Sequence, residues 1–175
     1  NELELILQQW ANFYLIMSAA ASTLIGLLFV VITLAAQRWV KKVEATAKIG
    51  VYVLPSVVSY VSVLGIAALM TFPNHTRLTA TLCICLLGFA GVVLSGSILI
   101  GGDKNNYEKR RDLIPHSVFP LAAYLLLVLG GVVLLHDPRC GLIFVAVGML
   151  SLLMIAIRNT MAMAIGVTST HHDLD

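Results

Sequence analysis

Five long runs of apolar residues, none of which contains a charged side chain, dominate this sequence. They extend roughly over residues 11–36, 49–72, 78–100, 118–135 and 141–157. Crossing the hydrocarbon core of a bilayer takes about 20 apolar residues in a helix, and every backbone donor and acceptor there must be bonded internally. The runs therefore predict an all-α integral membrane helical bundle of about five transmembrane helices, forming a single domain over residues 1–175.

The composition agrees with this prediction. Charged residues make up 11% of the chain and hydrophobic residues 59%, whereas a soluble domain carries about 25% charged residues. A large part of the surface must therefore face lipid. The net charge of +2 is too small to indicate a nucleic acid as a partner.

Basic residues predict the orientation of the bundle. Four follow the first run and four follow the third, whereas Arg77 and Arg139 stand alone after the second and fourth runs. The two basic segments contain Arg38, Lys41, Lys42 and Lys48, and Lys104, Lys109, Arg110 and Arg111. Because loops rich in lysine and arginine stay in the cytoplasm, we expect the amino terminus outside and the carboxyl terminus inside.

The segment before the first run, residues 3–10, mixes acidic and apolar residues. Two interpretations are open. The segment lies at the membrane interface, with Trp10 and Tyr14 as anchors, or it is the frayed end of the first helix.

The first run carries a recognisable order of residue types. It reads Trp10, Phe13-Tyr14, Ala19-Ala20-Ala21, Thr23-Leu24 and then residues 26–30, GLLFV. Over residues 10–36 it resembles a group of small bacterial multi-span proteins, some of which are labelled "modulator of FtsH protease". The resemblance implies a multi-pass protein of the bacterial cytoplasmic (inner) membrane and brings no functional residues with it.

Small residues recur at helical spacing in two runs and are candidates for helix interfaces. They are Ser18, Ser22 and Gly26 in the first run, and Gly88, Gly91 and Ser95 in the third. Such spacing lets helix backbones approach closely in lipid. It indicates either packing within one subunit or an interface between subunits of a homo-oligomer.

The second run carries a polar stripe. Tyr52, Ser56, Ser59 and Tyr60 fall at i, i+4, i+7 and i+8, which places them on one helix face. One interpretation is that this face lines the pore of an oligomer. The other is that the hydroxyls bond to carbonyl groups within their own bundle, as serines in membrane helices commonly do.

Arg158 follows the fifth run and completes the set of candidate pore-lining residues. If the fifth helix ends at Ile157, Arg158 is an interfacial side chain that extends to the headgroups. If the helix continues to Val167, Arg158 lies within the membrane, where a ring of arginines would favour anions in a pore.

A third candidate site is the charged loop of residues 103–112. Its basic residues Lys109, Arg110 and Arg111 are suited to bind anionic lipid or a cytoplasmic protein. The alternative is that the loop only sets the membrane orientation.

The sequence points away from catalysis and from cofactors. Its five histidines and three cysteines form no metal-ligand pattern, and the sequence has neither a GxSxG motif nor a phosphate-binding loop. We expect no enzyme activity, no metal and no cofactor. The main functional hypothesis is a homo-oligomeric pore or channel of the bacterial cytoplasmic membrane, and the alternative is a non-conducting membrane subunit or regulator that binds a partner.

Overall fold

The described residues of the computed structural model form five α-helices. The structure describes residues 2–39, 43–72, 76–101 and 107–169, and side chains for residues 5–34, 53–72, 76–97, 118–162 and 164. The helices are α1 (Glu2–Trp39), α2 (Val43–Thr71), α3 (Arg77–Gly101), α4 (Tyr107–Val133) and α5 (Pro138–Ser169). No strand occurs within these ranges, so the all-α prediction is confirmed.

Four of the helices contain a stretch that is long and apolar enough to cross a membrane. These stretches are Leu5–Leu34, Val53–Thr71, Arg77–Ser97 and Pro138–Ala162. The fourth predicted span corresponds to a shorter apolar stretch of α4, Val118–Val133. Together these helices indicate a membrane protein.

Four helices, α1, α2, α4 and α5, extend by several residues beyond the apolar runs from which they were predicted. α1 begins at Glu2, so the segment before the first run continues the helix. α4 begins at Tyr107, so Lys109, Arg110 and Arg111 lie on a helix and the prediction of a loop for these three residues was wrong. Lysine, arginine and glutamate are good helix formers, which lets a helix continue where the apolar pattern stops.

The turn between α4 and α5 is held by Asp137, which caps the amino end of α5. One carboxylate oxygen, Oδ1, accepts the backbone N–H groups of Arg139 at 3.0 Å and Cys140 at 3.3 Å. Pro138 occupies the first helical position, where its missing N–H leaves no bond unmade. These bonds explain why the Asp137-Pro138 pair ends one helix and begins the next.

Asp137 makes the stability of this turn depend on pH. Hydrogen bonds from the Cys140 thiol and backbone, with a further one from the Arg139 backbone, hold the pKa of Asp137 below its ordinary value. A depressed folded-state pKa means that the stabilisation is present at neutral pH and is lost as the pH falls through that pKa. Asp137→Asn keeps the cap but removes the titration. We expect wild type to melt at a higher temperature than Asp137→Asn at pH 7, in thermal melts in detergent.

That difference should shrink as the pH falls below the ordinary aspartate pKa of 3.8. A difference that stays constant down to pH 3 would contradict the capping role.

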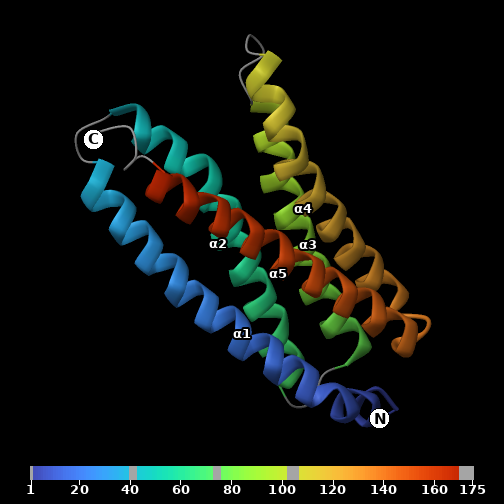
Figure 1. The fold of residues 1–175 in the computed structure, drawn as a ribbon. Helices are drawn as coiled ribbons and strands as arrows, with labels where there is room; N and C mark the ends of the chain where they lie inside the picture. Colours follow the sequence, from blue (N-terminus) through green and yellow to red (C-terminus); the bar gives the residue numbers. More distant parts are fainter. Residues whose placement is uncertain (1, 40–42, 73–75, 102–106, 170–175) are drawn as a thin grey trace.

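The helices form a bundle that opens at one end (Figure 1). α1, α2 and α5 pack on one another, α3 packs along α4, and α4 also packs on α5. α3 and α4 converge with the others at the end where α3 begins, and they diverge from α1 and α2 toward the end where α3 ends and α4 begins. α2 and α3 therefore form two arms that separate toward that end.

The core of the bundle contains three tyrosines among its largest fully buried side chains. They are Tyr14 of α1, Tyr60 of α2 and Tyr124 of α4. A buried tyrosine usually finds a hydrogen-bond partner for its hydroxyl. Tyr60 and Tyr124 have such partners, whereas the Tyr14 hydroxyl has none.

Candidate functional site

The hydroxyl-bearing face of α2 points into the bundle of the single chain. Ser56, Ser59 and Tyr60, predicted to share one face, are 1%, 2% and 0% exposed. The i, i+3 and i+4 spacing of these residues places them together, and α5 and α4 cover them. The face is therefore part of the core of one chain.

Tyr60 joins α2 to α5. Its hydroxyl lies 3.2 Å from Oγ1 of Thr160. The Thr160 hydroxyl itself donates to the Ala156 carbonyl at 2.8 Å. Because a hydroxyl has only one proton to donate, the Tyr60 hydroxyl must be the donor to Thr160.

A second set of hydroxyls joins α2 to α4. Ser62 Oγ lies 3.3 Å from the Tyr124 hydroxyl, and Ser59 lies near the same hydroxyl. Ser59 donates its own proton to the Pro55 carbonyl at 2.8 Å. We call Ser59, Ser62 and Tyr124 the hydroxyl cluster.

The candidate pore-lining residues do not all meet at this cluster. The side chain of Tyr52 lies outside the described residues. Arg158 is exposed and precedes Thr160 by two positions, which turns it about 200° around α5, away from Tyr60. For Ser59 and Tyr60 the observed contacts are bonds within the bundle. A pore lined by this face in an oligomer stays a prediction.

Arg158 lies on a continuous helix. α5 continues to Ser169, so of the two sequence interpretations the longer helix describes the backbone. Arg158 is 20 residues beyond Pro138, or about 30 Å along the axis, which matches the thickness of a hydrocarbon core. With Pro138 at one interface, this spacing brings Arg158 to the other.

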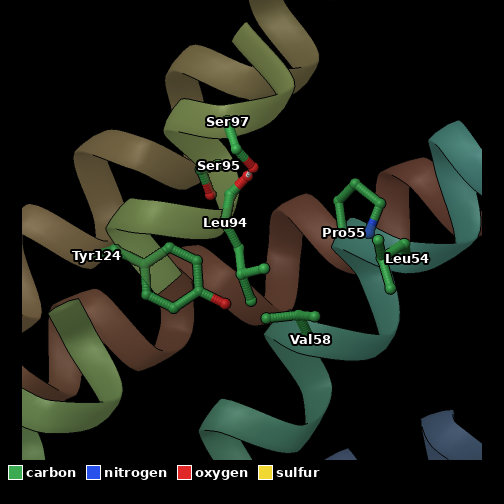
Figure 2. Close-up of a pocket in the computed structure, with 7 residues that line it drawn as sticks. All are labelled: Leu54, Pro55, Val58, Leu94, Ser95, Ser97 and Tyr124. Carbon is green, nitrogen blue, oxygen red and sulfur yellow. Dashed lines mark hydrogen bonds between the residues drawn. The ribbon is translucent and has the colours of Figure 1, made fainter. Parts of the chain in front are cut away.

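A small cavity lies beside the hydroxyl cluster, where α2 and α3 begin to separate (Figure 2). Its volume is about 40 Å³. Its lining comes from three helices: Leu54, Pro55 and Val58 of α2, Leu94, Ser95 and Ser97 of α3, and Tyr124 of α4. Leu54 and Leu94 are 53% and 41% exposed, so the cavity opens sideways from the bundle between two exposed leucines.

The candidate interface glycines of α3 are used inside the chain. A Cβ on Gly88 would lie 2.8 Å from Cγ2 of Val128, and one on Gly91 would collide with the ring of Tyr124. These two glycines let α3 and α4 approach closely, and Ser95 lines the cavity. Gly88 and Gly91 therefore pack against α4 within one subunit.

The candidate interface face of α1 is left open. Ser18 is half-buried, Ser22 is exposed, and a Cβ on Gly26 would meet nothing within 4 Å. Gly26 lies about 140° around the helix from the buried Ala21. The Ser22 hydroxyl bonds the Ser18 carbonyl at 2.8 Å, so this face presents no unbonded hydroxyl at Ser22.

Three residues that complete the hydrogen bonds were not predicted from the sequence. Ser62 and Thr160 were not singled out, and neither was Tyr124, the tyrosine of the run 118–135. A hydroxyl-bearing aromatic residue inside an apolar run was the available signal, because such a residue needs a partner. The identity of the partner required the packing of α4 against α2 and α3.

The three cysteines are described in the structure and form no disulfide. Cys83, Cys85 and Cys140 are free thiols. Within the described residues, no group of three or more histidine, cysteine, aspartate or glutamate side chains is placed to hold a metal ion. The side chains of Lys109, Arg110 and Arg111 lie outside the described residues.

We compared the chain with models of protein families, with curated proteins and with solved structures. None of the three comparisons found a match.

Proposed function

We propose that this chain is a non-conducting membrane subunit or regulator of the bacterial cytoplasmic membrane. The observation that carries the proposal is the inward direction of the α2 hydroxyls. Ser59, Ser62 and Tyr60 bond to groups of the same chain. To line a pore between subunits, this face would have to give up those bonds and leave the bundle core.

The proposed location and orientation rest on charge and on resemblance. The positive-inside rule puts the end where α3 ends and α4 begins in the cytoplasm. α1, α3 and α5 all begin at the opposite end (Figure 1), which fits an amino terminus outside and a carboxyl terminus inside. The bacterial origin comes from the resemblance of residues 10–36 to small bacterial membrane proteins.

We propose a second copy of the chain as a partner of α1. Of the residues in its apolar stretch only 17% are buried, compared with 44% in that of α2 and 50% in that of α5. Ser22 and Gly26 leave a shallow place on this uncovered side where another helix backbone can approach.

Gly26→Leu should separate the two copies, because a large side chain would hold the helix backbones apart. The measurement is the mass of the protein in nanodiscs. We expect a dimer for wild type and a monomer for Gly26→Leu. Leu27→Trp is the matched control, because Leu27 is exposed about 100° around α1 from Gly26 and its enlargement should leave the dimer intact. A wild-type monomer, or equal masses for all three proteins, would contradict this partner.

Planar-bilayer recordings of the purified protein test the functional proposal itself. We expect no conductance above that of protein-free bilayers under voltage or tension. Reproducible channel openings in wild type that Ser59→Leu reduces would overturn the proposal in favour of the pore. The interpretation as a pore requires that the Ser59→Leu protein has the same mass in nanodiscs as wild type.

A further inference from the structure

The cavity between α2 and α3 lies in the region that a bilayer would fill with acyl chains. We propose that it is the inner end of a binding groove for one anionic phospholipid. An acyl chain of the lipid lies between the diverging arms α2 and α3, and its headgroup lies at the basic ends of α2 and α4. This site is separate from the α1 face and does not depend on the number of subunits.

The lining fits an alkyl chain. Leucine, valine and proline side chains make up most of it, and Leu54 and Leu94 flank the side opening. A volume of about 40 Å³ equals roughly three water-sized volumes. It therefore accommodates a short alkyl segment and excludes a headgroup or a folded peptide.

The position along the helices also fits a lipid of one leaflet. Leu54 is six residues beyond Lys48 on α2, or about 9 Å along the axis. Tyr124 is 13 residues beyond Arg111 on α4, or about 20 Å. One leaflet of hydrocarbon is about 15 Å thick. A lipid whose headgroup lies level with Lys48 thus extends its chains to the depth of Leu54.

Charge selects the class of lipid. Residues 38–48 carry four basic and one acidic residue, and residues 103–112 carry four basic and three acidic residues. These two segments together have a net charge of +4, in a chain whose total is +2. α2 and α4 both begin at the end of the bundle where the arms separate (Figure 1). Basic residues at a membrane surface attract anionic headgroups.

Native mass spectrometry of the full chain tests the groove. The probes are dioleoyl phosphatidylglycerol and dioleoyl phosphatidylcholine, supplied in equal amounts. We expect wild type to retain one phosphatidylglycerol with a preference of about fivefold or more over phosphatidylcholine, the factor that one basic residue at an anionic surface supplies. Equal retention of the two lipids, or no retained lipid, would overturn the proposal.

Two tryptophan variants of α3 locate the lipid. Leu94→Trp fills the side opening and should abolish the retained lipid. Leu86→Trp is the matched control, because Leu86 is 74% exposed on the same helix and does not line the cavity. Equal lipid retention by the two variants would place the lipid elsewhere and overturn the groove. Neutralising Lys109, Arg110 and Arg111 with glutamine should reduce the preference for phosphatidylglycerol.

A second measurement keeps the test decisive if Leu94→Trp does not fold. Ser97 is exposed and lines the cavity. Ser97→Trp is combined with Trp10→Phe and Trp39→Phe, so that the tryptophan at position 97 is the sole tryptophan of the chain. Phosphatidylglycerol brominated on its acyl chains should quench Ser97→Trp more strongly than brominated phosphatidylcholine does at the same mole fraction. Leu86→Trp in the same background should be quenched equally by both lipids. If the two brominated lipids quench equally at position 97 as well as at position 86, the tryptophan at position 97 contacts bulk lipid only, and the site would be overturned.

Discussion

Gly91→Ala is expected to lower the free energy of unfolding by about 1–3 kcal/mol, the usual cost of overpacking a core. The added methyl group would collide with the ring of Tyr124. That ring is fully buried, and its hydroxyl is bonded to Ser62 of α2, so it has little freedom to move aside. α3 and α4 would have to separate to make room.

Gly96→Ala is the matched control for this variant. Gly96 lies on the same helix, and a Cβ there would meet nothing within 4 Å. We expect its stability to stay within about 1 kcal/mol of wild type, the size of the helix-propensity difference between glycine and alanine. The measurement is the unfolding equilibrium of the protein in bicelles. Equal effects of the two variants would mean that α3 and α4 do not approach closely at Gly91.

Ser59→Leu has the second large expected effect, a loss of about 2–4 kcal/mol in the free energy of unfolding. Ser59 is 2% exposed, so the larger branched side chain has no room. The substitution also removes the hydroxyl that lies near Tyr124 and donates to the Pro55 carbonyl at 2.8 Å. Core overpacking and a lost bond therefore act together.

Ser59→Ala separates these two causes. Alanine removes the hydroxyl without adding bulk, and Tyr124 keeps its contact with Ser62. Hydrogen bonds between membrane helices contribute about 0.6 kcal/mol on average, so we expect Ser59→Ala to stay within about 1 kcal/mol of wild type in the same assay. A serine that lined a wide aqueous path could be replaced by leucine with little loss of stability. A small effect of Ser59→Leu would therefore contradict the burial of Ser59.

The sequence predicted where the helices are better than where they end. Uninterrupted apolar runs must become helices in a bilayer, because no other structure satisfies the backbone there. The start of α1 was left open and the start of α4 was missed, because Glu2, Lys109 and their neighbours are polar and hydropathy does not report helix propensity. Asp137-Pro138 was located well, since it combines a capping side chain with a proline at the first helical position.

The candidate site shows a different limit. Helical period placed Ser56, Ser59 and Tyr60 on one face, and the structure buries all three. The period could not tell what covers that face, because a polar stripe has the same spacing whether it lines water or bonds to another helix. Tyr124 and Thr160, which cover it, are 62 and 100 residues away in sequence from Ser62 and Tyr60. Only the packing of α2 against α4 and α5 identifies them.

The small-residue faces illustrate the same limit. Ser22 and Gly26 have the same kind of spacing as Gly88 and Gly91. In the structure the pair on α3 packs against α4, while the pair on α1 remains uncovered. Spacing indicates that a helix can approach closely. Which helix approaches depends on the order in which the helices pack.

The most direct test of the inward hydroxyl face is the reactivity of a cysteine at position 59. Ser59→Cys is placed in a chain whose Cys83, Cys85 and Cys140 are replaced by alanine, and the protein in liposomes is exposed to a membrane-impermeant thiol reagent. Thr76→Cys serves as the reactive control, because Thr76 is exposed just before α3. Burial in the bundle predicts that Cys at position 59 stays unlabelled while the control reacts. Labelling at position 59 as fast as at position 76 would show a water-filled path along α2 and would contradict the account.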